Sequence, residues 1–232
     1  MTHAEFFEGR DPRMDFSILK RGDEHISTSD YTVPSPTNER TGYGIRKYAN
    51  KTFWARQRSY IDRPVLRYAE VLLNFIEAKY ELEGEVSDDD LDATINVLRA
   101  RLPEVNTGTA SSPKYEALPA LSNSFVNSNG LKMRDEIRRE RLVELAFEGF
   151  EYWDLIRWKT AETEMSKSLK GVYLFSELIE NGWSASAKVD EKNYIIMQDA
   201  SLRSFNPDRD YLWPIPTNEI AKNPKIEQNP GW

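Results

Sequence analysis

Four glutamates at helical spacing are the residues of this sequence best placed to do chemistry. Each lies four positions after the one before, so all four would share one face of a helix, interleaved with arginines. They are Glu136, Glu140, Glu144 and Glu148. Such a stripe would suit general acid and base catalysis, or a metal site of the kind found in helical bundles.

Two features of the sequence argue against both kinds of chemistry. The bundle metal motif pairs Glu with a His three residues later, and no His follows position 25. Neighbouring arginines would lower the pKa of these carboxyl groups, whereas a general acid needs a raised pKa. The stripe is therefore interpreted as a structural ladder of ion pairs between stacked helices, which Asp154 and Arg157 on the following helix would extend. No catalytic residue and no metal ligand is predicted.

Composition excludes further classes of function. The chain has 232 residues, no Cys and two His, which excludes thiol chemistry and disulfides and disfavours a His-rich metal site. A formal charge of −7 without a basic block disfavours nucleic-acid binding. No apolar run approaches the roughly 18 residues of a membrane span. With 12% aromatic residues, the chain is instead typical of a folded globular protein and not of a disordered one. No cofactor is predicted.

The regular part of the chain is predicted to begin at residue 65. Apolar residues recur at spacings of three and four over residues 66–80, which predicts a helix that ends near Gly84. Ser87 is expected to cap the next helix, because three aspartates follow it where the helix dipole favours negative charge. That helix is expected to continue until Pro103. The two helices form a first hairpin.

A second helical hairpin is predicted up to residue 165. Its helices are expected over residues 131–147 and 150–165, with Gly149 between them in the left-handed conformation that ends helices. The aromatic stripe at the start of the second helix, which includes Trp153, is interpreted as core. Both hairpins are about 35 residues long, close to the ~34-residue period of tetratricopeptide repeats.

Less regular segments flank the hairpins. Residues 1–64 are predicted to form a loop-rich layer with a short strand at 16–19, because Gly, Pro, Ser and Asn recur without helical periodicity. Residues 166–232 are predicted as a mixed segment with a strand at 194–197, followed by a Pro-rich tail in which Trp213 lies across the helices. The predicted fold is mostly α, with tetratricopeptide-like helix hairpins, a loop-rich layer and little β-structure.

Aromatic residues in the irregular segments are the candidate ligand-binding residues. Tyr43, Trp54 and Trp183 would present flat rings beside hydrogen-bonding side chains, which is what a sugar ring requires. The alternative is that these rings pack the loop layer onto the helices.

Six stretches of the sequence resemble one known family, and they follow that family's order over nearly the whole chain. Two strings are highly specific, ELAFEG-x-x-YWDL-x-RW and WPIP-x-x-EI-x-x-NP-x-x-x-QNPG. With these strings the sequence closely resembles the C-terminal half of the SusD/RagB family. The six stretches are EGRDPRMDFSILKRGD (8–23), GYGIRKY (42–48), RYAEVLLNFIEAKYEL (67–82), INVLRAR (95–101), IRRERLVELAFEGFEYWDLIRW (137–158) and YLWPIPTNEIAKNPKIEQNPGW (211–232).

The resemblance implies a non-enzymatic protein of the outer-membrane surface. Members of the family are lipoproteins of Bacteroidota that bind glycans or other nutrients and cover a SusC-like TonB-dependent transporter as its lid. They are largely helical, with four tetratricopeptide-like helix pairs that support a loop-rich binding layer. We therefore predict that the chain binds nutrients, in particular oligosaccharides, for delivery to such a transporter.

The sequence also differs from the family in some features, and two alternative functions stay open. Family members begin with a signal peptide, a lipidated Cys and a long N-terminal half, which are missing here, so the chain is expected to be the C-terminal part of a larger surface protein. One alternative is a helical scaffold that docks to the transporter without a ligand site of its own. Another is a glycoside hydrolase, which would need two carboxylates about 5 to 9.5 Å apart in a cleft.

Overall fold

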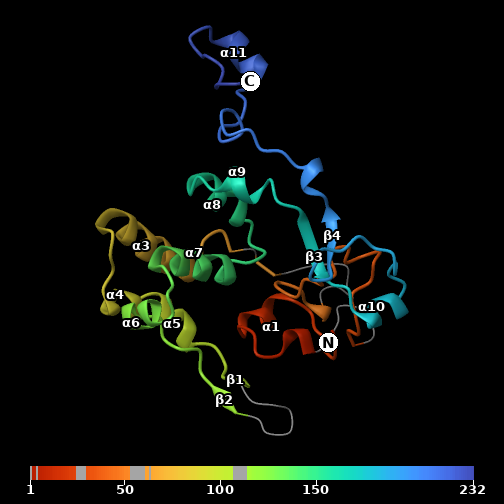
Figure 1. The fold of residues 1–232 in the computed structure, drawn as a ribbon. Helices are drawn as coiled ribbons and strands as arrows, with labels where there is room; N and C mark the ends of the chain where they lie inside the picture. The colour runs from red at the N-terminus through yellow and green to blue at the C-terminus, as the bar shows by residue number, and fades with distance from the viewer. Residues whose placement is uncertain (1, 4, 25–29, 53–60, 63, 107–113) are drawn as a thin grey trace. The chain divides into compact units, whose positions relative to one another are not determined.

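A computed structural model of the chain shows two compact units, drawn together in Figure 1. The first consists of residues 1–149 and 175–183, and the second of residues 150–174 and 184–232. The first unit holds the longer helices, and the second holds the longer strands. The structure describes residues 2–3, 5–24, 30–52, 61–62, 64–106 and 114–232.

The first unit is organised around helix α3, Tyr68–Glu83. One face of α3 packs against α5, Ile95–Ala100, and α7, Met133–Glu144, and its Ile76 is completely buried. The helix ends at Gly84, whose φ of 78° is the left-handed conformation that glycine adopts without strain. The end of this helix is therefore as predicted, but its start is not, because Leu66 of the predicted apolar period lies before the helix and is exposed.

The helix after α3 is capped as predicted but is shorter than predicted. Helix α4, Asp88–Asp92, begins with a reciprocal capping box in which the Ser87 hydroxyl accepts from the Asp90 amide and the Asp90 carboxylate accepts from the Ser87 amide. The predicted continuation to Pro103 is wrong, because Thr94 leaves helical geometry at φ −128° and ψ −89°. Its hydroxyl donates to the carbonyl of Asp90, which competes with the helical hydrogen bonds.

Around α7 the first unit departs again from the predicted boundaries. A short helix α6, Asn123–Ser128, lies within the predicted connection. Helix α7 ends at Glu144 rather than at residue 147, and Phe147 already has a positive φ of 64°. Gly149 adopts the predicted left-handed conformation at φ 87°. Two positive-φ residues thus end this helix where a single glycine was expected.

The loop layer of the first unit contains short elements. They are η1, Glu5–Phe7, helix α1, Arg13–Ser17, and a two-stranded hairpin of β1, Val105–Asn106, and β2, Tyr115–Glu116. The predicted strand at 16–19 is wrong in its first half, because Phe16 and Ser17 belong to α1. Only Ile18 makes an antiparallel bridge, to Ile45.

A buried ring cluster joins the first residues to helix α10, Ser176–Glu180. Phe175 is 1% exposed, and its ring lies 5.7 Å from the rings of both His3 and Phe6, measured between centroids. His3 is fully buried, and its backbone amide donates to the Glu177 carboxylate. The core of this unit therefore brings together segments more than 170 residues apart in the sequence.

His3 should make the stability of the first unit depend on pH. Among the described residues neither of its ring nitrogens has a hydrogen-bond partner, and burial lowers the pKa of His3 below its ordinary value of 6.5 more than the charge of Glu177 raises it. A lowered folded-state pKa means that the neutral ring is favoured, so this stabilisation is complete above pH 6.5 and is lost as the pH falls through 6.5 toward the folded-state pKa. In urea unfolding at pH 7.5 and 5.5, His3→Phe should lose less stability on acidification than the wild type, and equal losses would contradict this reasoning.

The second unit combines short helices with an antiparallel ribbon. Helices α8, Glu151–Arg157, and α9, Ala161–Glu164, replace the single predicted helix over residues 150–165. Lys159, at φ 56°, separates them. The ribbon pairs β3, Leu169–Tyr173, with β4, Tyr194–Gln198, which confirms the strand predicted at 194–197. The tail carries η2, Ala200–Leu202, and α11, Thr217–Lys222.

The aromatic residues of α8 are not the buried stripe that was predicted. Trp153 is 56% exposed, and only Asp154 of this helix is buried. Trp153 stacks on Trp213 of the tail at 6.2 Å between ring centroids, and the Trp213 indole N–H donates to the Tyr152 hydroxyl. The tail therefore lies across α8 as predicted, but with both indole rings at the surface, because a two-turn helix offers too little area to bury them.

The predicted fold class is confirmed. Helices make up most of the regular structure, and the described residues contain two two-stranded sheets. Within the described ranges, no helix combines the length and the apolar character needed to cross a membrane.

Candidate functional site

Glu140 lies at the centre of the charged ladder on α7. It is fully buried, and its two carboxylate oxygens receive hydrogen bonds from Arg13 at 2.9 Å, from Arg139 at 2.9 Å and from Arg99. Burial alone would raise the pKa of Glu140, but the charges of Arg13 and Arg99 and their hydrogen bonds outweigh burial and hold the pKa below its ordinary value. Glu140 is thus an ionised structural anchor for three segments of the chain.

The ladder continues to Glu144 at the end of α7 and then to Glu148, which lies in the turn after the helix and not on its face as predicted. Glu144 receives hydrogen bonds from Arg67 at 2.7 Å and from Arg101 at 2.6 Å. Glu148 receives a further bond from Arg67 at 2.8 Å and forms an ion pair with Lys47. Burial opposes ionisation of Glu148, but these partners lower its pKa. The contacts agree with the predicted ladder of ion pairs.

The geometry of the ladder does not suit a general acid or a metal centre. Such an acid needs a raised pKa, and the pKa values of Glu140 and Glu148 are lowered. In the part of the chain that the structure describes, no group of three or more His, Asp or Glu side chains is arranged to hold a metal ion. Asp154 and Arg157 form an ion pair at 2.9 Å within α8, in the second unit.

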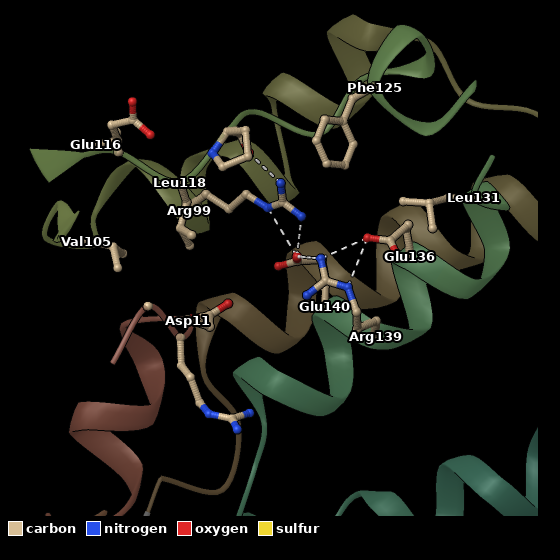
Figure 2. Close-up of a pocket in the computed structure, with 14 residues that line it drawn as sticks. Asp11, Arg99, Val105, Glu116, Leu118, Phe125, Leu131, Glu136, Arg139 and Glu140 are labelled. Carbon is tan, nitrogen blue, oxygen red and sulfur yellow. Dashed lines mark hydrogen bonds and ion pairs between the residues drawn. The ribbon is translucent and has the colours of Figure 1, made fainter. Parts of the chain in front are cut away.

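A cavity of about 410 Å³ opens beside the start of the ladder, entirely within the first unit (Figure 2). Helix α7 forms one wall, and the β1–β2 hairpin, the segment after it, and residues 9–11 form the others. Acidic, basic and apolar side chains contribute to the same space. The lining residues are Gly9, Arg10, Asp11, Arg99, Val105, Glu116, Ala117, Leu118, Pro119, Phe125, Leu131, Glu136, Arg139 and Glu140.

The polar wall of the cavity is fixed by hydrogen bonds between its own side chains. Arg139 lies between two carboxylates in Figure 2, donating from Nε to Glu136 Oε2 at 2.9 Å and from Nη2 to Glu140 Oε1 at 2.9 Å. Arg99 donates to the Pro119 carbonyl as well as to Glu140. Among the described residues, no hydrogen bond involves Glu136 Oε1 or Arg139 Nη1. Glu136 Oε1 and the N–H groups of Arg139 Nη1 are therefore among the polar groups that remain for a ligand.

The apolar wall of the cavity carries an aromatic ring. Phe125 lies in the first turn of α6, and its amide donates to the Ser122 hydroxyl that caps this helix. Its half-buried ring lies across the cavity from the charged residues in Figure 2, with Leu131 nearby. A ring opposite fixed polar groups is an arrangement able to hold a small amphipathic ligand.

The three aromatic residues predicted to contact a ligand lie away from this cavity or outside the described residues. Tyr43 is half-buried, with its ring centroid 6.3 Å from that of Phe6. Trp183 is 8% exposed, and its indole N–H donates to the Pro34 carbonyl at 2.8 Å. Trp54 falls outside the described residues. Their contact with a ligand stays a prediction, and Trp183 supports a loop in this structure.

No pattern in the sequence indicates the cavity residues. Phe125 lies in a Ser- and Asn-rich stretch that reads as a connection, and its weak helical signal is the Ser122 cap. In the sequence, Glu136 stands out only as a member of the ladder, and Arg139 only as one of the arginines interleaved with it. The cavity itself depends on the hairpin of β1 and β2 and on residues 9–11, which no local pattern places beside α7.

The fold and the cavity define a mostly helical scaffold with a small, charged recess. The SusD family profile matches residues 1–232, so the chain belongs to the SusD family. A SusD-like carbohydrate-binding protein from Bacteroides fragilis is 29% identical, with a TM-score of 0.67, over 97% of this chain and 43% of its own. A second SusD-like protein from that species is 27% identical, with a TM-score of 0.62, over 98% and 40%. The chain therefore spans about two fifths of the length of these structures. No curated protein matches.

Proposed function

We propose that the chain takes part in the non-enzymatic binding of oligosaccharides as nutrients. The observation that carries this proposal is its membership of the SusD family together with its likeness to a solved SusD-like carbohydrate-binding protein. The ladder carboxylates Glu140 and Glu144, which are candidates for glycoside hydrolysis, are held in ion pairs with arginines. Binding without catalysis is therefore the function that the site supports best.

The proposal extends to the place and the partner of this binding. We infer that the protein acts at the outer-membrane surface and delivers its ligand to a SusC-like TonB-dependent transporter, as the resemblance to the family implies. An interaction scaffold without a ligand site is the second candidate. It is favoured by the outer face of α3, where Tyr68, Val71, Phe75 and Leu82 are exposed.

If the chain binds oligosaccharides, it should bind at least one glycan on an array. Calorimetry with the glycan that binds best then measures the affinity. The aromatic rings of Trp54 and Tyr43 are expected to contact the glycan. Replacing either by alanine should weaken binding by about tenfold, because a stacking ring contributes about 0.5 to 1.5 kcal/mol beyond the area that it buries. Tyr68→Ala, an exposed tyrosine of α3, is the matched control and should leave affinity unchanged.

Oligosaccharide binding and the interaction scaffold predict opposite results in binding and copurification experiments. A chain that binds no glycan or peptide, yet copurifies with the transporter unaffected by Trp54→Ala and Trp183→Ala, would contradict the binding function and support the scaffold.

A further inference from the structure

We propose that the cavity beside Glu136 is a subsite for one neutral sugar ring. This assignment rests on the proposed oligosaccharide-binding function and gives it a location and a ligand class. It places a binding site on the helices of the first unit, in addition to the aromatic residues of the loop layer. Size, hydrogen bonding, ring stacking and charge support it in turn.

The size of the cavity suits a single sugar unit. Small-molecule pockets run from about 300 to 1,000 Å³. At about 410 Å³ this cavity lies near the lower end of that range. It would therefore hold one ring of a longer chain, with the neighbouring units outside it.

Glu136 Oε1 and Arg139 Nη1 match the hydroxyl groups of a sugar. A hydroxyl both donates and accepts, so it can donate to Glu136 Oε1 or accept from Arg139 Nη1–H. Both side chains come from one turn of α7 and are locked together by the Nε–Oε2 bond at 2.9 Å. Both bonds would be charge-assisted, and these are about twice as strong as neutral ones.

Phe125 supplies the apolar face that a sugar ring requires. Its ring lies across the cavity from Glu136 and Arg139 in Figure 2, so one ligand can contact the ring and both polar side chains at once. The C–H groups of a pyranose form an apolar face that packs against a flat ring, while its hydroxyls project from the rim. Leu131 widens this apolar wall.

The charges of the lining disfavour an acidic sugar. Four of the lining residues are carboxylic acids and three are arginines. Two of those arginines, Arg99 and Arg139, already donate to Glu140. Asp11 and Glu140 also pair with Arg13, and Glu116 pairs with Lys114, so the charges of the lining are already matched. A uronate or sulfate group would compete with these ion pairs, whereas a neutral ring would not.

The buried ladder prepares the subsite in advance of binding. Glu140 fixes both Arg99 and Arg139, and the Pro119 carbonyl holds Arg99 from the opposite side. Side chains that are already ordered lose little conformational entropy when a ligand binds. The polar wall can therefore bind without rearrangement.

Calorimetry of the 232-residue chain tests the assignment. The neutral probes are maltohexaose, cellohexaose, mannohexaose and xylohexaose, and the acidic probe is hexagalacturonic acid. At least one neutral probe should bind, and Phe125→Ala should weaken it by about tenfold, because the stacking face is lost. Phe125→Leu, which keeps apolar bulk, should also weaken it. Phe75→Ala, on the exposed face of α3, should have no effect.

The polar wall is tested in the same titrations. Glu136→Gln should weaken neutral-sugar binding several-fold, because a charged acceptor is replaced by a neutral one. Glu81→Gln, whose carboxylate pairs with Arg134 at the surface, is its control.

Three other results of these titrations would each overturn a different part of the proposal. Wild-type binding to a neutral probe that is unchanged in folded Phe125→Ala and Phe125→Leu, as judged by circular dichroism, would overturn the subsite and leave the proposed function standing. Tighter binding of hexagalacturonic acid than of every neutral probe would overturn the neutral ligand class. Absence of binding to all of the probes would overturn the proposed function and the subsite together.

Discussion

Glu140→Ala is expected to destabilise the chain by about 3 to 5 kcal/mol, the cost of breaking a buried ion pair by removing one partner. Glu140 is 0% exposed, and it accepts hydrogen bonds from Arg13 and Arg99, which are themselves buried. Removal of the carboxylate would leave Arg13 with Asp11 and the more distant Glu144, and Arg99 with one carbonyl. Urea unfolding followed by circular dichroism measures the loss.

Glu81→Ala is the matched control for this substitution. Glu81 also pairs with two arginines, Arg134 at 2.9 Å and Arg138 at 3.5 Å, but its side chain is partly exposed to water. Exposed ion pairs contribute about 0 to 1 kcal/mol, so this change should have a small effect. Equal losses of unfolding free energy for Glu81→Ala and Glu140→Ala would show that burial does not determine how strongly the ladder stabilises the chain.

A substitution that keeps the shape of the Glu140 side chain but not its charge separates the contribution of hydrogen bonding from the contribution of charge. Glu140→Gln retains an oxygen acceptor for one arginine but leaves the positive charges of Arg13 and Arg99 uncompensated. Most of the loss seen with alanine should therefore remain. Full recovery with glutamine would mean that hydrogen bonding, not charge, holds the three segments.

The helical part of the fold was largely predictable because its signals are local. The apolar period of α3 and the left-handed Gly84 that ends it, as well as the cap at Ser87, each depend on residues within a few turns. The resemblance to the SusD family then supplied the fold class, which the family match over residues 1–232 confirms.

The partners of the ladder could not be predicted, although the ladder itself was. Spacing alone places Glu140 on one face of a helix, but the arginine that pairs with it most remotely, Arg13, lies 127 residues earlier in the chain. The break between α4 and α5 at Thr94, where the hydroxyl donates to the Asp90 carbonyl, is not visible in the apolar period, which continues through it. The exposure of Trp153 likewise depends on how short α8 is.

The candidate site was the least predictable part. The cavity arises where α7 meets the β1–β2 hairpin and residues 9–11, and such a meeting is a property of tertiary packing. Of the loop aromatics predicted to contact a ligand, Trp183 has its indole buried against the carbonyl of Pro34. Phe125, which lines the cavity, has no neighbouring aromatic residue that would have drawn attention to it.

Phe175→Ala is expected to destabilise the first unit by about 3 to 5 kcal/mol, the usual cost of truncating a buried phenylalanine. Its ring is 1% exposed and meets the rings of His3 and Phe6 edge-on, each at 5.7 Å between centroids. The substitution would leave a cavity between the first residues and α10, two segments that the hydrogen bond from the His3 amide to the Glu177 carboxylate also joins.

The loss should be local as well as large. Because Phe175 connects the 175–183 segment to the first residues, amide hydrogen exchange in residues 5–7 and 176–183 should become faster in the variant than elsewhere in the chain. Phe175→Leu should recover part of the stability, since it leaves a smaller cavity. Phe75→Ala removes the same side chain where it is 54% exposed, and should change the free energy of unfolding far less. Uniform exchange, or equal losses for both alanine variants, would mean that the ring cluster does not hold the two segments together.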